Sequence, residues 1–485
     1  MIAAVKILFK DSVVYGVANV IQKITPLVII PIIISHLGKN AFKVYDLSFV
    51  YVFLFSSLVV LGQDSASSVF YFDKNQDHFD KKKVLAYSFF IQVFTIIGYL
   101  IFFWPFRYDV ASFIFHDDAY QARYWVLALA IIPGYFMFNF GLNVLLLNRR
   151  RTEYVSICFL LALLSIVGTV ITIVENSGGL DNLFYVLIGA MSFCGVLVTI
   201  ILRREIFTQL LPIDTRLLDK LVWFGLPFAL TSFFRQVIPS IDRFFLMKFN
   251  YLDVLPQYIL AVKLGSFINI AFNAFALAFT PYSLKKIHHS DAEKEISGIF
   301  QLVAVISLTS IPVILIFKYW MIDFFADASY VLAGQLLPLF LFGWAFDLFT
   351  NFALLGIYKS QKSFFILVLL MTGTVLISIL NMSLVPIYGV FGAAISFCVT
   401  KLASFGFAFV YLKRHFKISV DLGQFLGILL LMAICSALNY FINSYLYLGI
   451  VLIVLAGVSY YIYKTFKKHR LEQYLQINRE AEAGF

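Results

Sequence analysis

The residues of this sequence most able to do chemistry are charged side chains inside long hydrophobic stretches. Two such stretches, residues 221–247 and 256–281, carry Arg235, Asp242 and Lys263. A charge at membrane depth costs about 2.5 to 3.5 kcal/mol per residue on insertion scales. A segment that only had to span a bilayer would use Leu or Phe there, so these charges indicate a polar pathway or a binding cavity between helices.

Basic residues outnumber acidic ones at the expected membrane depth. The basic residues are Lys23, Arg235, Lys263 and Lys401, and the acidic residues are Asp64 and Asp347. A cavity with this excess of positive charge would attract an anionic group such as a phosphate or pyrophosphate, which Lys binds as a point charge and Arg can bind through two parallel hydrogen bonds. We therefore predict that these four basic residues bind an anionic substrate.

The same residues have a purely structural interpretation. Interhelical ion pairs, for example between Lys401 and Asp347, would fix helix packing without any binding function. The carboxylates Asp64, Asp347 and Asp242 are candidates for ion or proton coupling or for structural pairing. Asp242 and its neighbour Arg243 are expected near the outer interface, where a charged side chain can reach water at low cost.

The composition places these residues in a membrane protein. The chain has 485 residues, is 61% hydrophobic and only 13% charged, and has a mean hydropathy of +0.89, whereas soluble domains carry roughly 25% charged residues. The apolar runs have the length of membrane-spanning helices, and the alternating strands of a membrane barrel are not seen. The four cysteines fall inside these runs and are expected to be small core residues.

About fourteen spanning helices are predicted, which gives an all-α polytopic fold. They lie near residues 11–35, 44–72, 84–104, 124–147, 153–174, 182–202, 221–247, 256–281, 296–318, 331–357, 363–385, 389–412, 423–442 and 446–464. The first is read as an uncleaved span because no short apolar region with a cleavage site precedes it.

Most of the 37 basic residues fall in alternate loops when this set of helices is used. Cytoplasmic loops are the ones enriched in Lys and Arg, so the N-terminus and C-terminus are both predicted to be cytoplasmic. The net charge of +10 is then a signal of orientation, and it does not indicate nucleic-acid binding.

The loops also suggest the domain organisation. The longest polar connection, residues 203–220, separates two groups of six helices, which we expect to be lobes related by a pseudo-twofold axis along the membrane normal. The predicted divisions are an N-terminal lobe (1–204), a cytoplasmic linker (205–220), a C-terminal lobe (221–417), helices 13 and 14 (418–464) and a cytoplasmic tail (465–485).

Enzymatic activity is not expected. The sequence has no GxxxxGK[ST] phosphate-binding loop, no HExxH zinc motif and no large polar domain that could hold a nucleotide. The acidic loop at His116, Asp117 and Asp118 could hold a metal in a membrane glycosyltransferase, but a solvated turn is the preferred interpretation. No cofactor or metal is predicted.

Several phrases resemble a known family of membrane proteins. They are FGLPFAL at 224–230, SIDRFFL at 240–246, QYILAVKL at 257–264, AFTPYSLKK at 278–286, ILNMSLVPIYGVFGAAIS at 379–396 and LGKNAFKVYDLSF at 37–49. Together they resemble the Wzx-type oligosaccharide flippases of O-antigen, capsule and exopolysaccharide export, in the superfamily of multidrug, oligosaccharidyl-lipid and polysaccharide transporters. The resemblance covers nearly the whole chain, although Val69 stands where the family often has an arginine.

The resemblance implies a two-lobed transporter of the bacterial cytoplasmic membrane with a central cationic cavity and alternating access. Its cargo would be a polyprenyl-pyrophosphate-linked oligosaccharide, with Na⁺ or H⁺ as a possible coupling ion and a polysaccharide polymerase as a possible partner. The resemblance also supports Lys263 and Lys23 as cavity residues. The alternatives are a drug or cation antiporter of the same fold, which would need an acidic cavity, and a lipid II flippase, which differs only in cargo.

Overall fold

The computed structural model describes residues 2–72, 80–115, 119–207, 214–269, 279, 283, 292–360, 364–415, 422–442 and 446–458. Within these ranges the chain is helical and contains no strand. The helices of the N-terminal part are α1 (Ile2–Val59), α2 (Gln63–Phe72), α3 (Lys81–Phe103), α4 (Arg107–Phe115), α5 (Ala119–Leu147), α6 (Arg151–Thr169), the π-helix η1 (Val170–Glu175), α7 (Leu180–Ile201) and α8 (Arg203–Ile206).

The later helices are α9 (Thr215–Val237), α10 (Ile241–Lys248), α11 (Leu255–Gly265), α13 (Ala292–Ile316), α14 (Lys318–Phe325), the 3₁₀ turn η2 (Ala328–Tyr330), α15 (Val331–Ala353), α16 (Leu355–Ser360), α17 (Phe364–Tyr388), α18 (Val390–His415) and α19 (Leu422–Leu438). A further apolar helix, Leu446–Val458, follows. Among the described residues, ten helices are long and apolar enough to cross a membrane.

The predicted polytopic all-α fold is confirmed, and the helices fall on the predicted spans. The first predicted span and most of the second form α1, whose two helical parts meet in a kink at Gly38, where φ is 81°, and the end of the second span forms α2. Glycine adopts this left-handed backbone without a steric penalty. The seventh predicted span is divided into α9 and α10 by a turn that contains Pro239. The acidic loop at 116–118, which we expect to be a solvated turn, and the tail at 465–485 lie outside the described residues.

The chain forms two compact units. The larger unit comprises residues 1–297 and 322–419, and the smaller unit comprises residues 298–321 and 420–485. The smaller unit thus joins the predicted helices 13 and 14 to most of α13. The division of the remaining helices into two lobes stays a prediction.

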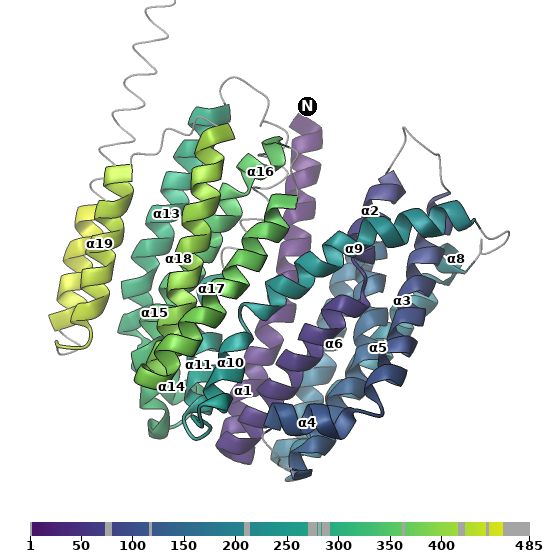
Figure 1. The fold of residues 1–485 in the computed structure, drawn as a ribbon, viewed down its shortest axis with the longest axis horizontal. Helices are drawn as coiled ribbons and strands as arrows, with labels where there is room; N and C mark the ends of the chain where they lie inside the picture. The colour runs from purple at the N-terminus through teal and green to yellow at the C-terminus, as the bar shows by residue number, and fades with distance from the viewer. Residues whose placement is uncertain are drawn as a thin grey trace, which may run out of the picture. The chain divides into compact units, whose positions relative to one another are not determined.

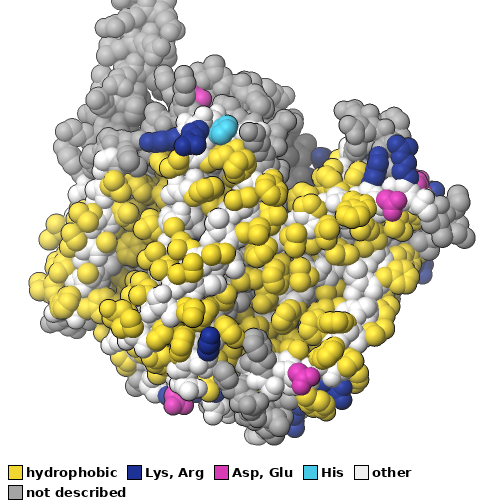
Figure 2. All heavy atoms as spheres, viewed as in Figure 1, with side chains coloured by type: hydrophobic (Ala, Val, Ile, Leu, Met, Phe, Trp, Pro, Cys, Tyr) yellow, Lys and Arg dark blue, Asp and Glu magenta, His cyan; other side chains and the backbone are white. Residues whose placement is uncertain are grey.

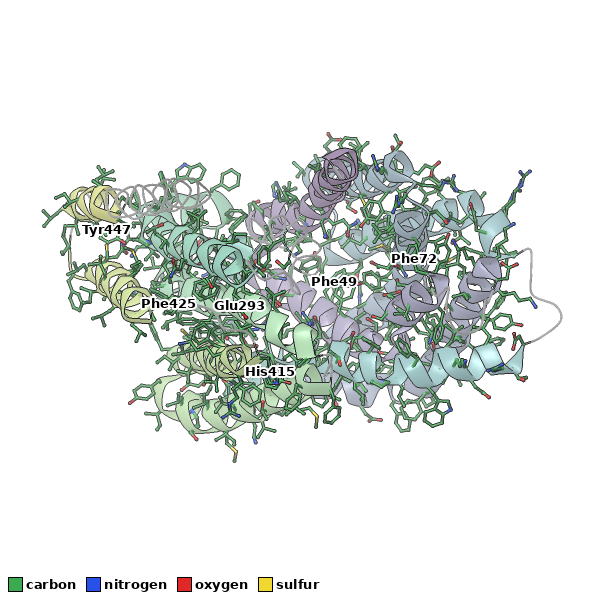
Figure 3. The ribbon with its side chains drawn as sticks, turned by 90° about the horizontal axis from the view of Figure 1, so that it is seen from above. Phe49, Phe72, Glu293, His415, Phe425 and Tyr447 are labelled. Carbon is green, nitrogen blue, oxygen red and sulfur yellow. The ribbon has the colours of Figure 1, made fainter. Side chains whose placement is uncertain are left out.

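In the smaller unit, α19 and the last helix both contact α13. The ring of Phe425 packs on Phe300, with 6.2 Å between the ring centroids, and the Tyr447 hydroxyl donates a hydrogen bond to the Pro312 carbonyl over 3.3 Å. Phe425 and Tyr447 lie on neighbouring helices in Figure 3. These contacts hold the unit together through aromatic packing and one buried hydrogen bond.

Within the larger unit, α1 and α9 join the N-terminal helices to the later ones. Helix α1 contacts α5 and α6 on one side and α9 and α11 on the other, and α9 crosses obliquely over α2 and α3 (Figure 1). The start of α9 packs Leu217 and Leu221 against Ala66 of α2 and Val84 and Tyr87 of α3. This apolar contact anchors the first turns of α9 on the N-terminal helices.

Helix α9 approaches the N-terminal part closely at the break between α1 and α2. Gly62 in this break has a φ of 62°, and a Cβ atom added there would lie 2.2 Å from the Gly225 carbonyl oxygen of α9. A Cβ added to Gly225 would lie 2.3 Å from the Leu61 carbonyl oxygen. The two backbones can cross at this distance only because both residues are glycines.

The outer faces of the helices are strongly apolar. Trp223, Phe364 and Ile387 are each at least 70% exposed, and on the face shown in Figure 2 hydrophobic side chains cover the flanks of the helices while Lys and Arg gather near their ends. At one such end, Arg150 donates hydrogen bonds to the carboxylates of Glu153 and Glu205, which raise the pKa of its guanidinium above the ordinary value. This surface is that of a multi-pass membrane protein.

Candidate functional site

A buried carboxylate joins α1 to two later helices. Asp46 lies in α1, about two turns beyond the bend at Gly38. Its Oδ2 atom accepts a hydrogen bond from Nε of Arg243 (α10) over 2.8 Å. Its Oδ1 atom lies 2.9 Å from Nζ of Lys263 (α11). The side chains of Asp46 and Arg243 are fully buried, whereas that of Lys263 is 31% exposed.

A second nitrogen of Arg243 has two further partners. Its Nη1 atom donates to the Pro239 carbonyl over 2.7 Å and lies 3.3 Å from Oδ1 of Asp242. The Tyr258 hydroxyl donates to Oδ2 of Asp242. The Asp46 cluster, comprising Asp46, Asp242, Arg243, Tyr258 and Lys263, therefore balances two carboxylates against two cations and fills most of their hydrogen-bonding capacity. Such a network avoids the large cost of an unpaired buried charge.

A second ion pair lies midway along α15 and α18. Nζ of Lys401 (α18) is 2.5 Å from Oδ1 of Asp347 (α15), and the ammonium lies 5.6 Å from the Trp344 ring centroid. The charge of Asp347 also acts on Lys23 of α1. Asp347 thus has two lysines in its surroundings, which leaves this group with a net positive charge.

Lys23 and Arg235 are the two predicted binding residues whose side chains stay exposed. Lys23 lies well inside the long apolar helix α1, and Arg235 lies in the last turn of the apolar helix α9. In the part of the chain that the structure describes, no carboxylate forms an ion pair with either residue within 4.0 Å. A basic side chain in this setting still needs an anionic partner or water.

Asp64 is placed differently from the other carboxylates. It stands in the first turn of α2, directly after the break at Leu61 and Gly62, where both residues have positive φ. It lines a cavity with the polar side chains of Ser56, Gln92, Tyr135 and Asn139, and the rest of the wall is apolar. The space open to water is about 20 Å³, which holds roughly one water molecule.

The predicted residues therefore form separate groups. Lys401 pairs with Asp347, whose charge also acts on Lys23, Lys263 pairs with Asp46, and no described contact connects Arg235 with either group. The alternative interpretation of Lys401 and Asp347 as an ion pair agrees with the geometry. The interpretation of Asp242 and Arg243 as residues that reach interfacial water is wrong, since their side chains are only 1% and 2% exposed.

Sequence reasoning missed Asp46 as the central carboxylate. The residue lies in the segment LGKNAFKVYDLSF at 37–49 and inside the predicted span 44–72, but it was not included among the charged residues at membrane depth. Its role depends on the bend at Gly38 and on contacts with α10 and α11, which the sequence of α1 alone does not show. Among the described residues, no group of three or more His, Cys, Asp or Glu side chains is arranged to hold a metal ion.

Comparisons with known proteins give the fold. No protein-family model and no curated protein sequence matches the chain. Among solved structures, the lipid II flippase MurJ in an inward closed conformation aligns with a TM-score of 0.68 at 14% identity, over 94% of this chain and 99% of that one.

Transporters of the same superfamily align almost as well. A multidrug resistance MATE family transporter in an outward-facing conformation gives a TM-score of 0.65 at 16% identity, over 84% of this chain and 95% of that one. A transporter from Pyrococcus furiosus, described as having a binding pocket of reverse polarity that suggests a different function, gives 0.64 at 16% identity, over 84% and 95%. The chain therefore has the fold of this transporter superfamily, whose members here are transporters and flippases and not enzymes.

Proposed function

We propose that this protein is a flippase that moves a polyprenyl-pyrophosphate-linked oligosaccharide, such as an O-antigen, capsule or exopolysaccharide repeat unit, across the bacterial cytoplasmic membrane. The fold supports a transporter or flippase. The observation that carries the choice of cargo is the pair of exposed basic side chains on apolar helices, Lys23 inside α1 and Arg235 in the last turn of α9. A pyrophosphate supplies the negative charge that these side chains lack.

The sign of the charge argues against a drug or cation antiporter. Such a transporter would use free carboxylates and aromatic rings to bind its cationic cargo. Here Asp46 and Asp347 are each already paired with basic side chains. Asp64 lines a cavity of about 20 Å³, which is far smaller than the 300 to 1,000 Å³, roughly, of a drug-sized pocket.

The Asp46 cluster suggests how the lobes would alternate. It joins α1 to α10 and α11 near the end of the bundle that the basic loops predict to be external. While Asp46 holds Arg243 and Lys263, the two predicted lobes stay together on that side. Opening to the outside must separate these side chains, and Lys263, which is 31% exposed, is the member that can exchange Asp46 for the pyrophosphate at lowest cost.

The same proposal places Lys401 at the pyrophosphate only after it leaves Asp347, since the two are in contact at 2.5 Å. Both termini would be cytoplasmic, and the flipped product would be the substrate of an external polysaccharide polymerase. A lipid II flippase would use the same chemistry on another pyrophosphate-linked glycan. Only the cargo itself separates these two proposals.

The test uses purified protein in liposomes that contain a polyprenyl-pyrophosphate with a short fluorescent glycan. Flipping is measured as the loss of fluorescence when labelled lipid reaches the leaflet that is accessible to a membrane-impermeant quencher. The variants Arg235→Gln and Lys23→Gln should each slow flipping about 10- to 100-fold, because a hydrogen bond to a charged group contributes roughly 1.5 to 3 kcal/mol. The control Lys248→Gln, at the end of α10, should flip at the wild-type rate.

The two competing functions give different results in the same experiment. Unchanged flipping in both Arg235→Gln and Lys23→Gln would contradict the proposed site. Glycan that is extended or cleaved in the vesicles would indicate an enzyme. Increased drug sensitivity of cells that lack the protein, with no flipping of the fluorescent lipid, would favour the antiporter.

A further inference from the structure

One buried charge in the described part of the chain, that of Lys318, has no partner of opposite sign. Four charged side chains are buried among the described residues: Asp46, Asp242, Arg243 and Lys318. The first three belong to the Asp46 cluster, where carboxylates and cations pair. Lys318, the first residue of α14, is 3% exposed, and no described carboxylate forms an ion pair with it. Its ammonium is therefore removed from water without a compensating anion.

The groups that surround Lys318 are neutral. Its ammonium donates a hydrogen bond to Oδ1 of Asn439, which follows the end of α19. The ammonium also lies 4.8 Å from the ring centroid of Tyr319 and 5.5 Å from that of Tyr440. An amide oxygen and the faces of aromatic rings attract a cation. They carry no net charge, so the positive charge of Lys318 is not balanced.

The two tyrosine rings lie between Lys318 and the outside of the protein. Tyr319 is 54% exposed and Tyr440 is 45% exposed. A ligand that displaces one of these rings therefore reaches the ammonium without entering the helix bundle. Each ring also carries a hydroxyl group, which can donate a hydrogen bond to an anion.

The aromatic side chains around Lys318 indicate the depth of the membrane interface. Lys318 directly follows the apolar span Ile296–Ile316, at the end that the basic loops predict to be external. Exposed aromatic side chains lie on both sides of this position, namely Phe317, Trp320 and Phe441, which are 55%, 66% and 85% exposed. Aromatic residues are enriched at the level of the lipid headgroups. The anion available at this depth is the phosphate of a phospholipid.

Lys318 also lies at a junction of helices within the smaller unit. Its partner Asn439 lies beside the Tyr447 hydroxyl, and that hydroxyl donates to the Pro312 carbonyl of α13. These contacts link α14, the end of α19 and the last helix to the same end of α13. An anion that binds Lys318 would therefore strengthen the packing of these helices.

We propose that Lys318 binds a phosphate group, supplied by the headgroup of a phospholipid in the outer leaflet, and that the bound phosphate stabilises the smaller unit. A lysine binds phosphate as a compact point charge. The site uses none of the predicted cargo-binding residues and does not depend on the function proposed above. It gives the predicted helices 13 and 14 a role in binding a membrane lipid.

The test measures the melting temperature of the purified full-length protein in detergent. In the lipid arm, dioleoylphosphatidylglycerol is compared with dioleoylglycerol, which has the same acyl chains and no phosphate. In the free-anion arm, sodium phosphate is compared with sodium chloride at equal ionic strength. Lys318→Gln removes the charge, and Asn439→Asp supplies an anion from within the chain. The control Lys248→Gln removes an exposed lysine that lies over the ring of Phe249.

The wild type and Lys248→Gln should melt several degrees higher with dioleoylphosphatidylglycerol than with dioleoylglycerol. Lys318→Gln and Asn439→Asp should lose most of that difference. Because its new carboxylate balances the ammonium, Asn439→Asp should also melt higher than the wild type in dioleoylglycerol. Stabilisation by the phospholipid alone identifies the headgroup as the ligand, whereas equal stabilisation by free phosphate supports the phosphate site and contradicts its lipid source.

The outcome is decided even if Lys318→Gln does not fold, because Asn439→Asp keeps the ammonium and the size of its partner. A response of Asn439→Asp to the phospholipid as large as that of the wild type would overturn the site. Equal melting temperatures of the wild type in the two lipids, with no effect of free phosphate, would do the same. An Asn439→Asp protein that melts below the wild type in dioleoylglycerol would show that Lys318 does not lack negative charge, which also contradicts the proposal.

Discussion

Asp46 of α1 and Arg243 of α10 form a buried ion pair, with 2.8 Å between Oδ2 and Nε, between parts of the chain that are distant in sequence. Lys263 of α11 binds the other oxygen of the same carboxylate at 2.9 Å. One carboxylate thus pairs with two cations from separate helices. Its removal affects both of them at once.

We expect Asp46→Ala to be strongly destabilising. It leaves Arg243 with only Asp242 and exposes Lys263 to an apolar surrounding without a partner, and removing one partner of a buried ion pair costs about 3 to 5 kcal/mol. The melting temperature of the purified protein in detergent measures the effect. The control Asp253→Ala, an exposed residue between α10 and α11, should change stability by less than about 0.5 kcal/mol. Equal melting temperatures for the two variants would show that the Asp46 pair contributes little.

The position of Lys263 determines which substitution tests its role in binding. Lys263→Glu would place a second carboxylate beside Asp46, so loss of transport in that variant could result from misfolding. Lys263→Gln leaves Asp46 paired with Arg243. We expect Lys263→Gln to keep the yield of folded protein and to slow flipping about tenfold or more. A wild-type flipping rate in this variant would remove Lys263 from the binding site.

The crossing of α9 over the break at Gly62 should be intolerant of side chains. An added Cβ at Gly225 would lie 2.3 Å from the Leu61 carbonyl oxygen, and at Gly62 the positive φ adds backbone strain. Gly225→Ala and Gly62→Ala should therefore lower the melting temperature by several degrees and reduce transport. Gly98→Ala is the matched control, because a Cβ at Gly98 meets nothing within 4 Å. A Gly225→Ala protein that melts and transports as the Gly98→Ala protein does would contradict this packing.

Much of the fold could be predicted from the sequence because each membrane-spanning helix satisfies its own backbone hydrogen bonds. Length and hydropathy alone therefore locate it. The helix breaks were harder to locate. Pro239 marked the turn between α9 and α10, but the break at Leu61 and Gly62 has no proline and lies inside one predicted span, 44–72. Breaks of this kind are stabilised by tertiary contacts, here with α9, and those contacts leave no local pattern.

The free-energy cost of a charge in the membrane singles out the important basic residues, but it does not identify their acidic partners. Because a charge at membrane depth is costly, insertion energies indicate that Lys263 and Lys401 need a compensating partner or a binding function. They do not indicate which carboxylate is that partner. Asp347 was a visible candidate for Lys401 because both lie in the middle of their spans. Asp46 was not considered, although it lies inside the predicted span 44–72, because its pairing with Arg243 and Lys263 depends on how α1 packs against α10 and α11. The sequence therefore predicted the basic side of each pair better than the acidic side.

The pair of Lys401 and Asp347 allows structural pairing and substrate binding to be separated. The two side chains are only partly buried, 12% and 26% exposed, so Lys401→Met and Asp347→Leu should each destabilise the protein, and the double variant should destabilise it less than the sum of the two. The expected coupling energy is about 0.5 to 3 kcal/mol. Melting temperatures of the four proteins, with Asp323→Leu as an exposed control, measure it.

Flipping by the same four proteins then decides the role of Lys401. If Lys401 only fixes packing, the double variant should flip nearly as well as the wild type, because neither charge is left without its partner. If Lys401 also binds the pyrophosphate, the double variant should be stable and still flip about tenfold or more slowly. Lys23, which lies within reach of the charge of Asp347, would then be the cation that remains, and adding Lys23→Gln to the double variant should abolish flipping. A triple variant that still flips would exclude this lysine pair from the cargo site.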